Sequence, residues 1–137
     1  MGFVLDSGVL IAAERDARPV SELLASLEHE HGETEIVLSS ITVIELEHGL
    51  HRAQTTVQAR KRREYPDTVF AAIPVESFTR EMGQLAAKLD GEARQTGRTI
   101  PFLDLLIGVT ALHFGYAIAT RNLRHFQMVP NLAVIQV

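Results

Sequence analysis

Short apolar runs alternate along this chain with segments whose apolar residues follow helical spacing. Continuous runs of four or five apolar, often β-branched residues are typical of strands covered on both faces, as in a parallel sheet between layers of helices. Alternation of such strands with helices predicts an α/β fold. The expected strands are residues 2–5, 35–39, 72–75, 116–120 and 132–136.

Helices are expected between these strands. Apolar residues from Val20 to Leu27, and again from Met82 to Ala93, recur at the three- and four-residue spacing of an amphipathic helix. Residues 102–114 are apolar nearly all round, which predicts a buried central helix.

Residues 41–53 and 55–70 are expected to form a helical hairpin. Together these elements predict a single domain, residues 1–137. Its fold is expected to be a three-layer αβα sandwich with a mainly parallel central sheet of about five strands.

Bulk properties restrict the classes of function. The chain contains no cysteine, which excludes disulfides, thiolate zinc sites and cysteine nucleophiles. No apolar run approaches the roughly 18 residues of a membrane span, and Asp6 interrupts the apolar start, so we expect a cytoplasmic protein without a signal peptide. The net charge of −4 argues against nucleic-acid binding by bulk attraction.

Three carboxylates stand where a predicted strand gives way to a helix, or in the first turns of a helix. Asp6 follows the first strand, Glu45 lies shortly after the second, and Asp104 stands inside an apolar run. In an open α/β sheet, sites form at the carboxyl ends of the strands. Three acids meeting there would offer an oxygen-lined nest for a hard cation such as Mg²⁺ or Mn²⁺.

Each acid alone also has a structural explanation. Asp6 fits the N-cap of a helix, Thr42 and Glu45 have the spacing of a capping box, and Asp104 complements a helix dipole. Buried unpaired carboxylates are costly, however, and a shared divalent cation would remove that cost. The structural explanations and the shared metal site both remain open at this point.

Four segments carry a resemblance to a known family. Residues 3–7 read Phe-Val-Leu-Asp-Ser, residues 44–49 Ile-Glu-Leu-Glu-His-Gly, residues 101–108 Pro-Phe-Leu-Asp-Leu-Leu-Ile-Gly, and residues 120–126 Thr-Arg-Asn-Leu-Arg-His-Phe. In this order and at these separations they resemble the motifs of PIN-domain ribonucleases, in particular the VapC-type toxins of bacterial toxin–antitoxin pairs. The resemblance covers essentially the whole chain.

The resemblance implies a Mg²⁺-dependent endoribonuclease, with Mn²⁺ able to substitute, which cleaves RNA phosphodiester bonds with a metal-activated water. Asp6, Glu45 and Asp104 match the three metal-binding acids. Asp6 and Asp104 are expected to bind the metal directly or through water, and Glu45 to bind a metal-bound water or act as general base. Thr120 and Asn122 match the family's polar pair and would orient that water or hold the phosphate.

Two departures from the family pattern stand out. Many relatives carry a further carboxylate at one of two positions, which are occupied here by Asn122 and His125. The expected metal site of this chain is therefore less negative, and binding of a second metal ion is in doubt. Gly8 stands where Asn or Ser is common, which removes one polar support for Asp6.

Basic side chains could contact RNA phosphates without reading its sequence. The alternative for the run at 60–63 is a solvated helix face balanced by Glu64 and Asp67. His48 and His51 share a helix face, but no clear third ligand accompanies them in a metal site. The expected RNA contacts are Arg52, Arg60, Lys61, Arg62, Arg63, Arg121 and His125.

The resemblance also implies partners: a cognate antitoxin, and a second copy of the chain in a homodimer. Apolar positions on the helices at 20–31 and 41–53 are the candidate dimer contacts. The alternative function is a non-catalytic PIN-like module that binds protein or RNA. A phosphatase-like or receiver-like domain with Asp6 as phosphate acceptor is a weaker option, because Gly8 stands where the phosphatase pattern has a second Asp.

Overall fold

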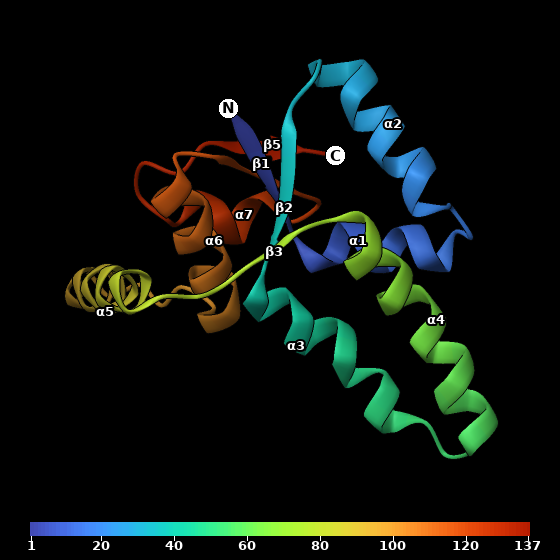
Figure 1. Ribbon diagram of the computed structural model, residues 1–137. Helices are drawn as coiled ribbons and strands as arrows, with labels where there is room; N and C mark the ends of the chain where they lie inside the picture. The colour runs from blue at the N-terminus through green and yellow to red at the C-terminus, as the bar shows by residue number, and fades with distance from the viewer.

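The computed structural model describes residues 1–137. Its five strands form one sheet in the order β3-β2-β1-β4-β5, and every neighbouring pair is parallel. The predicted α/β fold with a five-stranded parallel sheet is therefore confirmed (Figure 1). The strands are β1 (Gly2–Leu5), β2 (Glu35–Ser39), β3 (Val75–Glu76), β4 (Ala117–Thr120) and β5 (Val134–Gln136).

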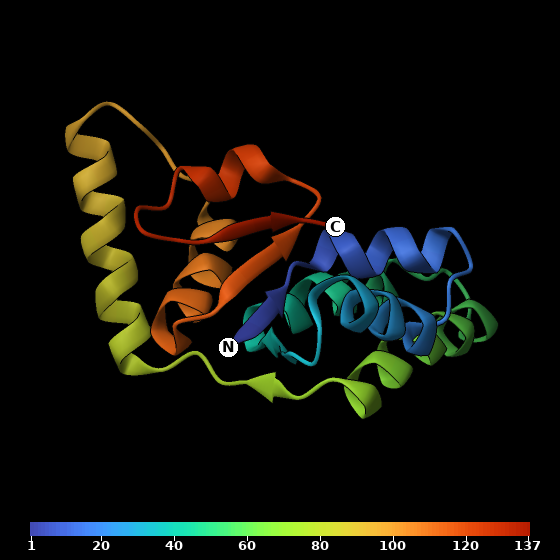
Figure 2. The ribbon, with the colours of Figure 1, turned by 90° about the horizontal axis from the view of Figure 1, so that it is seen from above.

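Helices cover both faces of this sheet. One face carries α1, α2 and α4, and the other carries α6 and α7; α5 packs outside α6 (Figures 1 and 2). α3 continues from β2 beyond the edge of the sheet. The helices are α1 (Ser7–Arg15), α2 (Val20–His31), α3 (Ser40–His48), α4 (Thr56–Ala72), α5 (Arg80–Gln95), α6 (Phe102–Phe114) and α7 (Leu123–Gln127).

The central strands β1 and β4 are buried along their whole length, because helices cover both faces of the sheet there. Successive side chains of β1 point to opposite faces. Phe3 and Leu5 join the core beneath α1, α2 and α4, whereas Val4 packs with Ile107 and Phe126 under α6 and α7. The expected central helix is α6, and it ends at Gly115 in the left-handed conformation (φ 67°).

Two predicted elements were placed wrongly. The third strand is Val75–Glu76 and not residues 72–75, because α4 runs on to Ala72 and buries Val69 and Ile73 four residues apart. The helix expected at 41–53 is broken after His48. Residues 50–52 form a separate 3₁₀ turn, η1 (Leu50–Arg52). No helix is long and apolar enough to cross a membrane.

Candidate active site

The sheet order brings the acid-bearing segments to one edge. β1 lies between β2 and β4, so Asp6, directly after β1, is flanked by the carboxyl ends of both neighbours. The backbone N–H of Asp6 donates to the carbonyl of Ala119 (2.9 Å). The first turns of α1, α3 and α6 gather at the same edge, the lower one in Figure 1. This is the edge at which α/β proteins hold their ligands.

Asp6 is buried and is held by the last residue of β4. The hydroxyl of Thr120, which is fully buried, donates to Asp6 Oδ2 (2.8 Å). Asp6 occupies the N-cap position of α1, yet its side chain makes no capping hydrogen bond. Burial raises the pKa of Asp6; Thr120 lowers it, and the negative charge of Asp104 raises it again. Backbone N–H groups of Ser7 and Gly8 lower the pKa of Asp6 further, so both Thr120 and the start of α1 support the charge of this carboxylate.

Glu45 projects from α3, and only part of the hydrogen-bonding capacity of its carboxylate is used. The cap of α3 is Ser39, whose Oγ accepts from the N–H of Ile41 (3.2 Å), so the capping box expected for Glu45 does not form. Glu45 Oε1 is buried without a hydrogen-bond partner. Burial raises the pKa of Glu45, the hydroxyl of Ser7 lowers it, and the charges of the other two acids raise it. An unpaired buried carboxylate oxygen is costly unless a cation or water meets it.

Asp104 lies in the first turn of α6 with its side chain 18% exposed. His125 Nδ1 lies 2.7 Å from Asp104 Oδ2 and also 2.7 Å from Asn122 Nδ2. The backbone N–H of Asn122 donates to Thr120 Oγ1 (2.8 Å). A continuous polar chain therefore joins Asp6 to Asp104 through the segment that follows β4.

The donor chemistry at this edge fits a hard divalent cation. All three acids offer oxygen ligands, which Mg²⁺ and Mn²⁺ prefer, and their charges act on one another. Their oxygens do not, as they stand, form a closed group of three or more metal ligands. Thr120 and His125 each contact one carboxylate oxygen, of Asp6 and Asp104 respectively, and Glu45 Oε1 has no hydrogen-bond partner.

A cleft of about 610 Å³ opens beside Glu45. Two of the basic residues expected to contact RNA, Arg52 and Arg62, line this cleft. Arg15 and His48 line it too, and Arg15 is not among the basic residues for which the sequence predicted an RNA contact. Arg15 is the last residue of α1, whereas Glu45 lies on α3. Only the packing of these two helices brings Arg15 close to Glu45.

The remaining predicted RNA contacts are dispersed. Arg63 forms a bidentate ion pair with Glu47 (2.6 and 2.7 Å), which ties α4 to α3. Lys61 lines another cleft, and Arg121 lines a third, of about 270 Å³, alongside α1 and α2. Arg60 is exposed. His125 contacts Asp104 in the acid cluster, and it is one of the two positions at which many relatives are expected to carry a further carboxylate.

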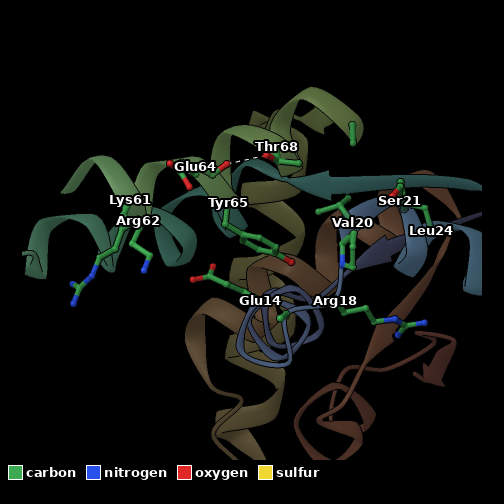
Figure 3. Close-up of a pocket in the computed structure, with 13 residues that line it drawn as sticks. Glu14, Arg18, Val20, Ser21, Leu24, Lys61, Arg62, Glu64, Tyr65 and Thr68 are labelled. Carbon is green, nitrogen blue, oxygen red and sulfur yellow. Dashed lines mark hydrogen bonds between the residues drawn. The ribbon is translucent and has the colours of Figure 1, made fainter. Parts of the chain in front are cut away.

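The largest cleft, about 860 Å³, runs between α4 and the end of α1 with the start of α2. Figure 3 shows Tyr65 and Glu14 near its centre, with Lys61 and Arg62 at one end and Arg18 toward the other. Glu14 and Arg62 line both this cleft and the one beside Glu45. The two clefts therefore meet at these side chains.

The fold and the site together define a class: an α/β protein in which carboxylates lie at the carboxyl edge of a parallel sheet. The oxygen atoms of these carboxylates suit a divalent cation. The chain belongs to the PIN domain family, whose model matches residues 3–131. The family resemblance drawn from the four motifs is thus confirmed.

Two curated relatives are similar over the whole chain. Ribonuclease VapC of Rickettsia bellii (strain RML369-C) is 28% identical over 140 residues, covering 100% of this chain and 97% of the relative. Ribonuclease VapC1 of Rickettsia felis (strain ATCC VR-1525 / URRWXCal2) is 26% identical over 140 residues with the same coverage.

Solved structures share the fold. The crystal structure of VapBC2 from Rickettsia felis bound to a DNA fragment from their promoter matches with a TM-score of 0.84 at 21% identity, covering 100% of this chain and 99% of the other. DNA-bound VapBC from Salmonella typhimurium matches with a TM-score of 0.83 at 18% identity, covering 99% and 98%.

Proposed function

We propose that this protein is a metal-dependent endoribonuclease, the toxin of a toxin–antitoxin pair. Membership of the PIN domain family and full-length similarity to proteins named Ribonuclease VapC support the activity. The observation that carries the proposal is the meeting of Asp6, Glu45 and Asp104 at one sheet edge, where each of the first two has a pKa raised by burial and by neighbouring negative charge.

In this proposal Asp6 and Asp104 hold Mg²⁺ or Mn²⁺, directly or through water, and Glu45 completes the site. The ion would supply Lewis-acid activation of water and neutralise charge on the phosphoryl oxygens. Glu45 accepts a proton or a hydrogen bond from the attacking water, since its raised pKa suits a general base. Thr120 fixes the rotamer of Asp6, and Asn122 holds Thr120 in turn.

RNA would approach along the cleft beside Glu45. Arg52 and Arg62, with Arg15, line a cleft that also contains Glu45, one of the three acids. Guanidinium groups suit bidentate phosphate contacts and would offset the repulsion between RNA and the acids. Arg63 is left out of this path because Glu47 already pairs with both of its terminal nitrogens.

A cognate antitoxin is the proposed protein partner. This is supported by structural neighbours that are VapBC complexes. We assign the antitoxin segment to the 860 Å³ cleft (Figure 3), because an occupant there that passed Glu14 and Arg62 would reach the cleft beside Glu45 and block RNA.

A homodimer remains a prediction. The buried apolar residues of α2 cannot contribute to a dimer contact, and Ile44 is the large exposed apolar residue of α3.

The test compares Asp104→Asn with Asp90→Asn, a matched change on α5 where Asp90 pairs with Arg94. Purified proteins are incubated with RNA in Mg²⁺, in Mn²⁺ and in EDTA. We expect wild type and the Asp90 variant to cleave RNA only with metal, and the Asp104 variant to lose cleavage by about 100-fold or more.

Normal cleavage by Asp104→Asn would refute the site. A wild-type protein that binds RNA or an antitoxin but neither binds Mn²⁺ nor cleaves RNA would instead support the non-catalytic module. Sequencing the RNA ends made during expression would identify the target.

A further inference from the structure

His125 contacts a carboxylate of the acid cluster, a contact that binding of an RNA phosphate would not require. Its Nδ1 lies 2.7 Å from Asp104 Oδ2, and the side chain of Asn122 meets the same nitrogen. A carboxylate can only accept, so the contact with Asp104 requires the proton on Nδ1. With that tautomer, the Asn122 amide is best turned so that its oxygen also accepts from Nδ1–H.

We propose that His125 is a positioning residue for Asp104, an inference that rests on the proposed function. The imidazole holds Oδ2 and thereby turns Oδ1 toward the nest. Hydrogen-bonded partners of metal-binding carboxylates fix ligand orientation and strengthen metal affinity. His125 does this without adding a fourth negative charge to a cluster in which burial, and then the neighbouring negative charges, already raise the pKa values of Asp6 and Glu45.

Packing does not account for the position of His125. Its side chain is 43% exposed. The residue of the short helix α7 that packs into the core is Phe126, which is fully buried and lies in the same apolar cluster as Ile107 of α6. The imidazole therefore contributes little to the core. Its polar contacts are directed at Asp104 and Asn122.

One short segment would then hold two metal ligands together. Thr120 donates to Asp6, and its Oγ1 accepts from the N–H of Asn122. Five residues beyond Thr120, His125 donates to Asp104. The turn after β4 thus fixes one oxygen of each acid, although the two acids come from different ends of the chain.

The test compares His125→Asn with His125→Leu. Asn keeps an N–H donor at nearly the place of Nδ1, whereas Leu keeps bulk and removes the donor. His113→Leu is the matched control, because His113 lies in the last turn of α6, far from Asp104 in the first turn, and packs on Phe114. Mn²⁺ affinity is measured by calorimetry without RNA, thermal unfolding is measured in EDTA, and RNA cleavage is measured separately.

We expect His125→Leu to weaken Mn²⁺ binding by about 10- to 100-fold, His125→Asn to stay within about 3-fold of wild type, and unfolding in EDTA to be unchanged. Wild-type Mn²⁺ affinity in the Leu variant would overturn the inference while leaving the proposed function intact. So would equal weakening by Asn and Leu, or a raised KM for RNA with unchanged Mn²⁺ affinity. Absence of Mn²⁺ binding and cleavage in the wild type would refute the proposed function itself.

Discussion

Replacing Thr120 with Val tests whether the buried carboxylate of Asp6 depends on a single donor. Thr120 is fully buried at the end of β4, and its hydroxyl donates to Asp6 Oδ2 (2.8 Å). Val has nearly the same shape and suits a strand, so the change removes the hydroxyl with little effect on packing. Thr120 supplies the side-chain donor to Asp6, and the backbone N–H groups of Ser7 and Gly8 also lower the pKa of this carboxyl.

The magnitude follows from the charge of the acceptor. A hydrogen bond to an ionised group contributes about 1.5–3 kcal/mol, roughly twice a neutral one. The N–H of Asn122 also loses its acceptor, but Asn122 is exposed and water can replace the hydroxyl there. We therefore expect Thr120→Val to lower the unfolding free energy of the metal-free protein by about 2–3 kcal/mol at neutral pH.

The assay is urea denaturation in EDTA, combined with a double-mutant cycle in which Asp6→Asn is the second change. Thr110→Val is the matched control. Thr110 is also fully buried, but its hydroxyl faces Ser39 Oγ and the carbonyl of Leu106, both at 3.0 Å. The control should cost about 1 kcal/mol, as neutral hydrogen bonds do, and should show no coupling to Asp6.

A coupling energy between Thr120 and Asp6 below about 0.5 kcal/mol would refute the reasoning. In that case the hydroxyl would not support the charge of Asp6. An equally large coupling for Thr110 would point to a general disturbance of the core.

Two further predictions follow from the charges. The pKa values of Asp6 and Glu45 are raised, so the stability gained by protonating them is fully present below their ordinary values and is lost as pH rises through the raised values. Unfolding measured in EDTA from about pH 4 to 8 should show Asp6→Asn gaining stability relative to wild type with rising pH. Arg63→Ala should lower the melting temperature and leave RNA cleavage unchanged, whereas Arg52→Ala should impair cleavage and leave melting unchanged; the opposite pairing would refute the assignment of these arginines.

The central strands and the three acids of the site were predictable from the sequence, because each is marked by a short pattern of neighbouring residues. Phe3 to Leu5 form a continuous apolar run, and the charge of Asp6 directly after it breaks the pattern. The third strand was not predictable in this way. The apolar residues up to Ile73 fit either a strand or the last turn of α4, and only the packing of α4 decides between them.

The side-chain contacts of the site were less predictable than its acids. The run from Arg60 to Arg63 looks uniform in sequence, yet Arg63 pairs with Glu47, Arg62 lines the clefts and donates to the carbonyl of Gly49 (2.7 Å), and Arg60 is exposed. Successive helical residues point about 100° apart, so four neighbouring charges must meet different surroundings. Which of them faces the site depends on the partner helix.

This chain has no fourth carboxylate at the site, and its three acids are oriented by hydrogen-bond donors instead. Hydrogen bonds from neutral donors lower the free energy of a buried charge without adding repulsion. Thr120 provides one for Asp6, and Ser7 lowers the pKa of Glu45. His125 provides the contact with Asp104. Each acid thus has a hydrogen-bonding partner that adds no negative charge, and a divalent ion would balance the charge of the acids. The donors would therefore orient the acids for metal binding, and the acids would supply the ligand oxygens and the negative charge.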